Sequence, residues 1–146
     1  MPFGLDTSFI VPVEVREHPG HKACRAWLDR AIADGATFAL APQVLTEFLH
    51  VVTDPNRFDR PLTMDAACRR AEAWWNASEV RPIYPGPDST RICLEWLRRH
   101  RLGRKRLLDA MLASTYYSGG ISEILTADAS GFAVFGVFKI VYPAHT

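Results

Sequence analysis

The sequence predicts an α/β fold in which helices cover both faces of a central, mostly parallel sheet of four or five strands. Short apolar runs alternate along the chain with longer segments of helical periodicity, which is the pattern of strands joined by crossover helices. Glycine, proline and capping residues separate these segments. A chain of 146 residues with 48% hydrophobic and 11% aromatic content can bury one core. We therefore expect a single domain over residues 1–146.

The first expected element is a buried strand over residues 1–6, an apolar run that ends in Asp6. A short helix over 7–15 follows despite its internal proline, beginning at Thr7 or Ser8. Both residues are good helix caps. The chain therefore passes directly from the carboxyl end of the first strand into a helix.

The next three elements are a helix, a strand and a helix. Apolar residues recur at helical spacing over 21–35, where Gly35 provides the stop. The run 37–41 predicts a second strand, and 42–53 predicts a helix with Pro42 in its first turn. The following residues, DPNRFDRP, have the composition of a loop.

The middle of the chain repeats this alternation. A helix over 62–78 is expected to be capped by Thr63, and a third strand is expected over 80–84. The next helix, over 89–103, would be capped by Asp88 or Ser89 and closed by Gly103.

The last part of the chain predicts one helix and two strands. The helix spans 104–120 and stops at its terminal pair of glycines. The apolar run in 123–128 ends in an acid, as the first strand does, and 138–143 supplies the last strand before a short tail. In parallel sheets of this kind, functional residues gather at the carboxyl ends of the strands.

Cysteine usage and hydropathy bear on the compartment. The three cysteines, Cys24, Cys68 and Cys93, are far apart and form no CxxC motif, so we expect reduced thiols rather than disulfides or a zinc site. No basic leader is present, and no apolar run approaches the roughly 18 residues of a membrane span. We therefore expect a cytoplasmic protein without a membrane segment.

Four acids stand in apolar surroundings. Asp6 and Asp128 follow two apolar runs, so both would lie at one edge of a parallel sheet. Glu47 and Asp109 share helical stripes with apolar residues, which predicts that both face the protein. Inward carboxylates are costly unless they are paired or bind a metal ion.

A convergent set of carboxylates has a specific chemistry. The four groups would repel one another and raise their pKa values unless a cation neutralised them. Oxygen ligands favour a hard ion, Mg²⁺ or Mn²⁺. Such an ion can activate water for attack on a phosphodiester. The pattern therefore predicts metal-dependent phosphoryl chemistry, most simply hydrolysis.

Four motifs resemble a known family in order and spacing. LDTSFIV, LTEFLHVVT, RLLDAMLAS and ILTADASGF, the last followed by VFKIVYP, are similar to the motifs of PIN-domain ribonucleases, and most closely to VapC-type toxins of bacterial toxin–antitoxin modules. The resemblance covers about residues 4–143. It implies a PIN-like fold, which is a Rossmann-like α/β/α sandwich, together with Mg²⁺ or Mn²⁺ and an RNA substrate. Where many PIN domains carry a further Asp, this chain has Ser130, which bears on a second metal position.

The resemblance also implies roles for individual residues and partners. The residues that would hold the metal and act in catalysis are Asp6, Glu47, Asp109 and Asp128. The supporting hydroxyls are Thr7, Ser8 and Thr126. The implied partners are a second copy of the chain in a homodimer and a VapB-type antitoxin, which would insert a tail into the acidic pocket.

The net charge of +1 conceals a polarised chain. Residues 98–106 read RRHRLGRKR and hold six of the seventeen Lys and Arg residues, so the remainder carries −5. The segment leads directly into the predicted helix that carries Asp109. A solvated turn is one interpretation. Binding of backbone phosphates is the other, and contact with the antitoxin competes with it. The expected RNA-binding residues are Arg101, Arg104, Lys105 and Arg106.

These observations together predict a metal-dependent endoribonuclease that leaves 5′-phosphate and 3′-hydroxyl ends. Two alternatives lie within the family: a degenerate PIN domain that acts as an RNA- or protein-binding module, and a housekeeping RNA-processing nuclease. A phosphatase of the haloacid dehalogenase type also begins with a strand that ends in Asp. That class needs a second Asp two residues later, where this chain has Ser8.

Overall fold

Five short parallel strands form one sheet in the computed structural model, which describes residues 1–143. The strand order is β3-β2-β1-β4-β5, so β1 lies at the centre. Phe3 pairs with Phe38 on one side of β1, and Gly4 pairs with Ile124 on the other. The bounds are β1 Phe3–Leu5, β2 Phe38–Leu40, β3 Val80–Pro82, β4 Glu123–Leu125 and β5 Lys139–Val141. The predicted α/β class with a parallel sheet is confirmed, at five strands.

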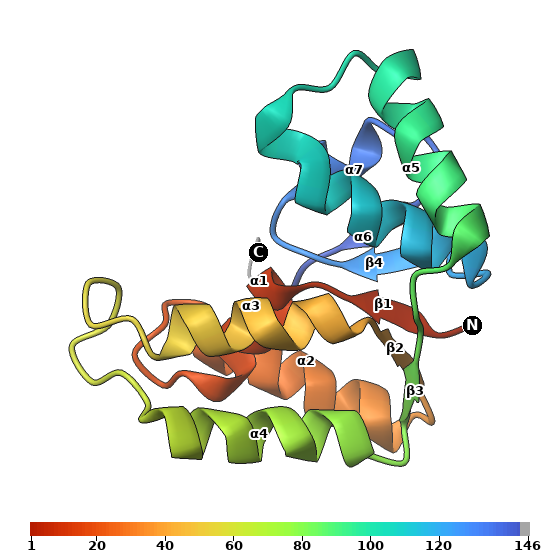
Figure 1. The fold of residues 1–146 in the computed structure, drawn as a ribbon. Coiled ribbons are helices and arrows are strands. Elements are labelled where there is room, and N and C mark those ends of the chain that lie inside the picture. The colour runs from red at the N-terminus through yellow and green to blue at the C-terminus, as the bar shows by residue number, and fades with distance from the viewer. Residues whose placement is uncertain (144–146) are drawn as a thin grey trace.

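The helices form two layers on either side of this sheet. Figure 1 shows α1 to α4 on one side and α5 to α7 on the other. This division follows from right-handed crossovers, because the chain moves outward from β1 to β3 and then returns past β1 to β4. The bounds are α1 Thr7–Glu14, α2 His21–Ala33, α3 Pro42–Val52, α4 Met64–Asn76, α5 Pro87–Arg99, α6 Leu107–Ser118 and α7 Ala129–Ala133.

Tyr116 joins three elements at the centre of the core. The side chain is fully buried, and its hydroxyl donates a hydrogen bond to the backbone oxygen of Leu5. The same hydroxyl accepts a hydrogen bond from the backbone N–H of Ala41 at 3.2 Å. Tyr116 thereby fixes the end of β1 and the start of α3 relative to α6. Two of the elements that carry predicted site residues, α3 and α6, are positioned by this one side chain.

Several predicted helix ends are wrong in detail. α1 begins at Thr7, but neither Thr7 nor Ser8 caps it; the N-cap position is Asp6, whose side chain makes no capping bond. α5 begins at Pro87 rather than at residue 89, because Pro is favoured at the first helical position. Ser89 lies inside the helix, where its hydroxyl accepts a hydrogen bond from Gly86 N–H at 2.7 Å.

The connection between α5 and α6 also differs from the prediction. α5 ends at Arg99, and Arg101, with φ of 51°, takes the left-handed conformation, so Gly103 does not close the helix. Residues Arg104–Arg106 form a separate 3₁₀ turn before α6. α7 was not predicted, since five residues are too few for a helical periodicity. Thr63 caps α4 as predicted, accepting from Ala66 N–H at 3.1 Å.

The remaining sequence expectations concern cysteines, the membrane and the chain end. All three cysteines are free, two of them buried and Cys68 half-buried. Among residues 1–143, no helix is both long and apolar enough to cross a membrane. The predicted domain and its short tail extend to residue 146, and residues 144–146 lie outside the described part of the chain.

Candidate active site

Asp6 lies at the carboxyl end of β1, where two hydroxyl groups hold its carboxylate. The residue is 8% exposed. Its Oδ2 accepts hydrogen bonds from Ser8 Oγ at 2.7 Å and from Thr126 Oγ1 at 2.6 Å. Ser8 belongs to the first turn of α1, and Thr126 directly follows β4. Because β1 and β4 are neighbouring parallel strands, their carboxyl ends bring these residues together.

The same hydroxyls fix the loop that follows β4. Ser8 Oγ accepts from the backbone N–H of Ala127 at 2.8 Å, and Thr126 Oγ1 accepts from the N–H of Asp128 at 3.0 Å. Each of these two hydroxyls therefore donates a hydrogen bond to the Asp6 carboxylate and accepts one from a backbone N–H. This arrangement explains why Ser8 does not cap α1: its hydroxyl orients a carboxylate instead. Both residues lie where a supporting role for Asp6 requires them.

Glu47 lies on α3 beside these groups, and its orientation differs from the prediction. The buried face of α3 is formed by Val44, Phe48 and the two terminal valines, whereas the Glu47 side chain is exposed. The expectation of an inward-facing Glu47 is therefore wrong: it lies at the edge of the apolar stripe. The spacing of Glu47 from Val44 and Val51 places it near the buried face of α3. Spacing alone does not say whether a residue at the edge of that face is buried or exposed.

The surroundings of the Glu47 carboxyl group nevertheless raise its pKa above the ordinary value. Burial around the carboxyl group is the largest cause, and the negative charges of Asp6 and Asp109 act in the same direction. A hydrogen bond from Thr7 and the positive charge of Arg57 oppose the rise. Thr7 is buried and also bonds Val44 O at 3.3 Å, so it ties α1 to α3 beside Glu47.

Asp109 approaches from the first turn of α6, on the other side of the sheet edge. Its side chain is 34% exposed, and burial is the largest cause that raises its pKa. Arg106 lowers this pKa, while Asp128 and Asp6 raise it. Asp6, Glu47 and Asp109 therefore come from three elements and interact electrostatically as one acidic group.

Asp128 lies beside this group and has a structural role as well. It is the N-cap of α7, and its Oδ1 accepts a hydrogen bond from Gly131 N–H at 3.0 Å. The side chain is exposed. A side chain at position 131 has no room, because an added Cβ would lie 2.2 Å from Asp128 Oδ2. The cap pairs Asp128 with the N–H of a glycine three residues later, whose burial is visible only in the structure.

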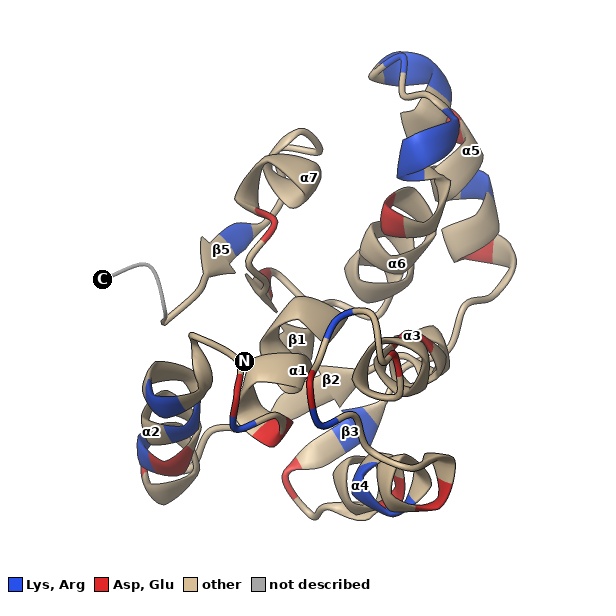
Figure 2. Ribbon diagram, turned by 90° about the vertical axis from the view of Figure 1, so that its left-hand side faces the viewer, with Lys and Arg blue, Asp and Glu red and all other residues tan. Residues whose placement is uncertain are grey.

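The predicted basic residues divide into two groups. Arg101, Arg104 and Lys105 are exposed at the tip between α5 and α6, where Figure 2 shows Lys and Arg gathered at one end of the molecule. Arg106 turns inward: its Nε lies 3.3 Å from Asp109 Oδ2, and its Nη2 donates to Gly131 O at 2.5 Å. The Arg106 Nε is buried and makes this ion pair without a well-directed hydrogen bond.

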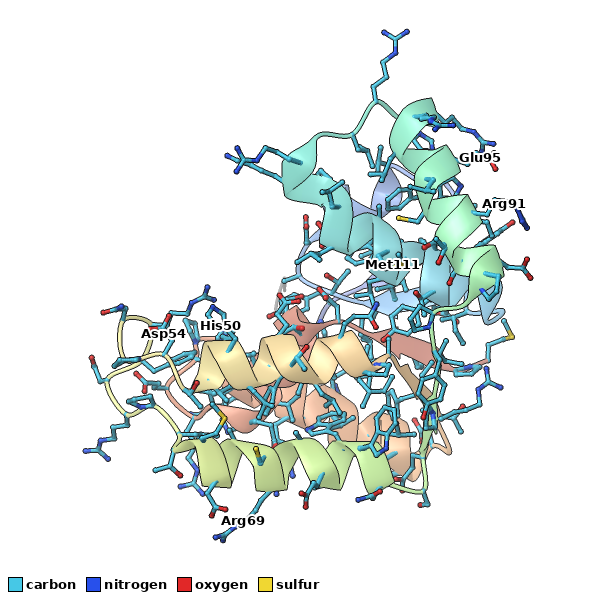
Figure 3. The ribbon with its side chains drawn as sticks, viewed as in Figure 1. His50, Asp54, Arg69, Arg91, Glu95 and Met111 are labelled. Atoms are coloured by element: carbon cyan, nitrogen blue, oxygen red, sulfur yellow. The ribbon has the colours of Figure 1, made fainter. Side chains whose placement is uncertain are left out.

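Two cavities meet at Glu47. The larger, of about 790 Å³, lies between α3 and the α5–α6 layer; we call it the α3–α6 cavity, and its lining includes His50, Leu108, Asp109 and Met111. Figure 3 shows His50 on α3 and Met111 on α6 at this boundary between the two layers. The smaller cavity, of about 540 Å³, lies on the other side of Glu47 and is lined by Thr7, Ser8, His18, Arg57 and Phe58, among others. We call it the Phe58 cavity.

The residues fit a hard divalent cation in their chemistry. Within residues 1–143 no three His, Cys, Asp or Glu side chains stand close enough together to hold a metal ion as they are placed. The donor set is nevertheless all oxygen, which suits Mg²⁺ or Mn²⁺. Asp6 and Asp109 both raise the pKa of Glu47, and a cation would relieve this repulsion. Asp109 is at present neutralised in part by Arg106.

Comparison with known proteins identifies the class. The model of the PIN domain family matches residues 4–136, so the chain belongs to the PIN domain family. It is similar to the ribonuclease VapC24 of Mycobacterium tuberculosis, with 27% identity over 141 residues that cover 95% of this chain and 94% of that protein.

Two solved structures share the fold. The structure of VapC20 from Mycobacterium tuberculosis, described as a sarcin–ricin loop cleaving toxin, matches with a TM-score of 0.67 at 21% identity, covering 90% of this chain and 93% of that one. A toxin–antitoxin complex from Klebsiella pneumoniae matches with a TM-score of 0.64 at 15% identity, covering 97% of each chain. The predicted resemblance to VapC-type PIN domains is thus confirmed.

Proposed function

We propose that this protein is a metal-dependent endoribonuclease, the toxin of a VapC-type toxin–antitoxin module, and that the whole chain forms one PIN domain. The nuclease class follows from membership of the PIN family and from the similarity to VapC24. The observation that carries the proposed metal dependence is the mutual electrostatic interaction of Asp6, Glu47 and Asp109 at the carboxyl edge of the sheet.

Asp6, Glu47 and Asp109 would hold one Mg²⁺ or Mn²⁺, with Asp128 contributing through water or a second ion. When bound, the ion lowers the pKa of a coordinated water and offsets the charge of the phosphodiester. Ser8 and Thr126 keep the Asp6 carboxylate in one orientation, so little reorganisation is needed when the site is loaded.

The residues also supply a route for the proton of the attacking water. A carboxylate whose pKa is raised is a better proton acceptor than an ordinary one. The proposed acceptor is a carboxylate of the acidic group that does not itself coordinate the ion, because a bound cation lowers the pKa of its ligands. Attack of water on phosphorus and departure of the 3′ oxygen leaves a 5′-phosphate and a 3′-hydroxyl.

The proposed RNA-binding surface is the exposed tip formed by Arg101, Arg104 and Lys105. The helix that carries Asp109 begins directly after this basic turn, so a strand held there would pass the acidic residues. Replacing Arg104 and Lys105 with Ser should weaken RNA binding and reduce its salt dependence by about two phosphate contacts. An unchanged salt slope would remove the tip from the RNA interface.

The proposed protein partners are a VapB-type antitoxin and a second copy of the chain. A cationic side chain on an antitoxin tail would suit Asp6, Glu47 and Asp109, and it would compete with Arg106 for Asp109. The toxin–antitoxin complex with the same fold supports the antitoxin proposal. The exposed leucines at the start of α6, Leu107 and Leu108, provide apolar area for an interface.

Cleavage of total RNA in Mn²⁺ tests the proposed function. We expect native protein to cut, and Asp6→Asn and Asp109→Asn to lose at least two orders of magnitude in rate, because each loses a charged ligand. Asp88→Asn, at an exposed position on α5, is the matched control and should cut normally. Equal cutting by all four proteins refutes the site. A native protein that binds RNA without cutting it favours the binding-module alternative.

A further inference from the structure

We propose that the Phe58 cavity is a nucleotide subsite in which an unpaired base of the RNA stacks on Phe58 while its phosphate contacts Arg57. This inference rests on the proposed ribonuclease function and names where the strand beside the cut would be held. The cavity of about 540 Å³ falls within the range of small-ligand sites, so one nucleotide fits.

The position of the cavity points to a substrate strand. Glu47 borders both the Phe58 cavity and the α3–α6 cavity, and Asp109 lines the latter. Thr7 and Ser8, which contact Glu47 and Asp6, line the Phe58 cavity directly. An RNA strand that crosses the acidic residues would therefore pass from the α3–α6 cavity into the Phe58 cavity.

The chemistry of the lining suits a nucleotide. Arg57 is exposed and lines the same cavity as Glu47, so its guanidinium can reach a phosphate held there. Phe58 is half-buried, with part of its ring available in the cavity wall. A guanidinium for the phosphate beside an aromatic ring for the base is the usual combination in single-strand binding sites.

The loop that carries these two residues is held in place. The N–H groups of Asp59 and Arg60 donate to the two carboxylate oxygens of Glu17, each at 3.0 Å. At the other end of the loop, Arg57 Nε lies 3.2 Å from Asp54 Oδ2. Figure 3 shows Asp54 at the end of α3, close to His50. The subsite is therefore formed before RNA binds.

His18 also lines the Phe58 cavity, where its ring can recognise a base. Its Nδ1 accepts a hydrogen bond from Gly20 N–H at 2.9 Å, so the neutral ring carries its proton on Nε2. Burial and the neighbouring His21 lower the pKa of His18 from its ordinary value, which favours the neutral ring. A neutral N–H donor can distinguish bases by their carbonyl or ring-nitrogen acceptors.

Binding of a fluorescein-labelled random decamer RNA, measured by anisotropy in Ca²⁺ to prevent cleavage, tests the inference. Phe58→Leu should weaken binding about tenfold, and Phe58→Tyr should retain it, because stacking is preserved. Arg57→Gln should weaken binding and lower the salt slope by about one. The matched control is Arg69→Gln. Like Arg57, Arg69 forms an ion pair with a nearby Asp, but it lies on the outer face of α4, where Figure 3 shows it in solvent.

The possible outcomes separate this inference from the proposed function. If native protein cleaves RNA, and Phe58→Leu and Arg57→Gln bind RNA with the native affinity, the subsite is overturned. The ribonuclease proposal then stays intact. Variants that bind RNA normally but lose antitoxin binding make the cavity a protein-docking surface, which also overturns it. A native protein that neither binds nor cuts RNA refutes both proposals. If Phe58→Leu fails to fold, the exposed Arg57→Gln decides alone.

Discussion

Arg106 Nε lies 3.3 Å from Asp109 Oδ2, with both residues at the start of α6. Arg106 also donates to Gly131 O, so one guanidinium joins the acidic residues to the α7 turn. The last residue of a basic run thus serves a different purpose from its exposed neighbours. It neutralises part of the charge that a metal ion would otherwise meet at Asp109.

Replacing Arg106 should raise the pKa of Asp109. Arg106 is the largest influence that lowers this pKa, so Arg106→Gln leaves burial, Asp128 and Asp6 to raise it unopposed. The shift can be followed by carbon NMR of the Asp109 carboxyl group during a pH titration. Arg104→Gln, in the same 3₁₀ turn but exposed, is the control and should leave the titration unchanged. Equal titrations for both variants would contradict the ion pair.

Gly131→Ala should destabilise the protein. The new Cβ would lie 2.2 Å from Asp128 Oδ2 and 2.9 Å from Arg106 Nη2, so the cap of α7 and the Arg106 contact must both shift. Loss of a helix cap costs about 1 kcal/mol, which sets the lower end of the expected loss of unfolding free energy in urea. Gly103→Ala meets nothing within 4 Å and should have no such effect. A native-like midpoint for Gly131→Ala would show that α7 adjusts without cost.

The stability of the metal-free protein should depend on the charge of Glu47. Its folded pKa is raised from 4.5, so the folded state holds this proton more tightly than the unfolded chain. The associated stability is present below pH 4.5 and is lost as the pH rises through the raised folded pKa. In EDTA, Glu47→Gln should therefore unfold at higher urea than native protein at about pH 7.5, and at the same urea at about pH 3.5.

A second glutamate provides the comparison for this pH effect. Glu72→Gln removes an exposed carboxylate from α4, outside the acidic site. Its unfolding midpoint should match that of native protein at both pH values. Mg²⁺ should stabilise native protein and Glu72→Gln more than Glu47→Gln, because only the latter lacks a proposed ligand. If Glu47→Gln has a higher unfolding midpoint than native protein at both pH values, the cause is packing rather than the charge of Glu47.

Tyr116→Phe should cost about 1–3 kcal/mol of unfolding free energy, because it leaves a buried carbonyl and a buried N–H without their partner. The carbonyl belongs to Leu5, next to Asp6, and the N–H to Ala41, at the start of α3. Tyr117→Phe is the neighbouring control: that side chain is 46% exposed and should tolerate the change. Urea denaturation of the two variants makes the comparison, and equal midpoints would assign the Tyr116 hydroxyl no structural role.

The sequence predicted the strands and the longer helices because apolar periodicity and caps are local. It predicted that Asp6 and Asp128 lie at one edge of the sheet, because each follows an apolar run that predicts a parallel strand. The place of Thr126 came from the resemblance to PIN domains. It did not predict that Glu47 is exposed, since helical spacing locates a stripe but not its boundary. The inward turn of Arg106 was also missed, because it depends on Gly131 O, a partner distant in sequence.

The hydrogen bond from Thr126 to Asp6 closes a span of 120 residues. Its acceptor directly follows β1 and its donor directly follows β4, so β4 must pair beside β1 before the bond can form. A ribosome-bound fragment that stops before β4 therefore contains three of the four acids but neither Thr126 nor the central sheet pairing that aligns Asp6. We therefore expect the acidic group of Asp6, Glu47 and Asp109 to assemble only after β4 has paired with β1.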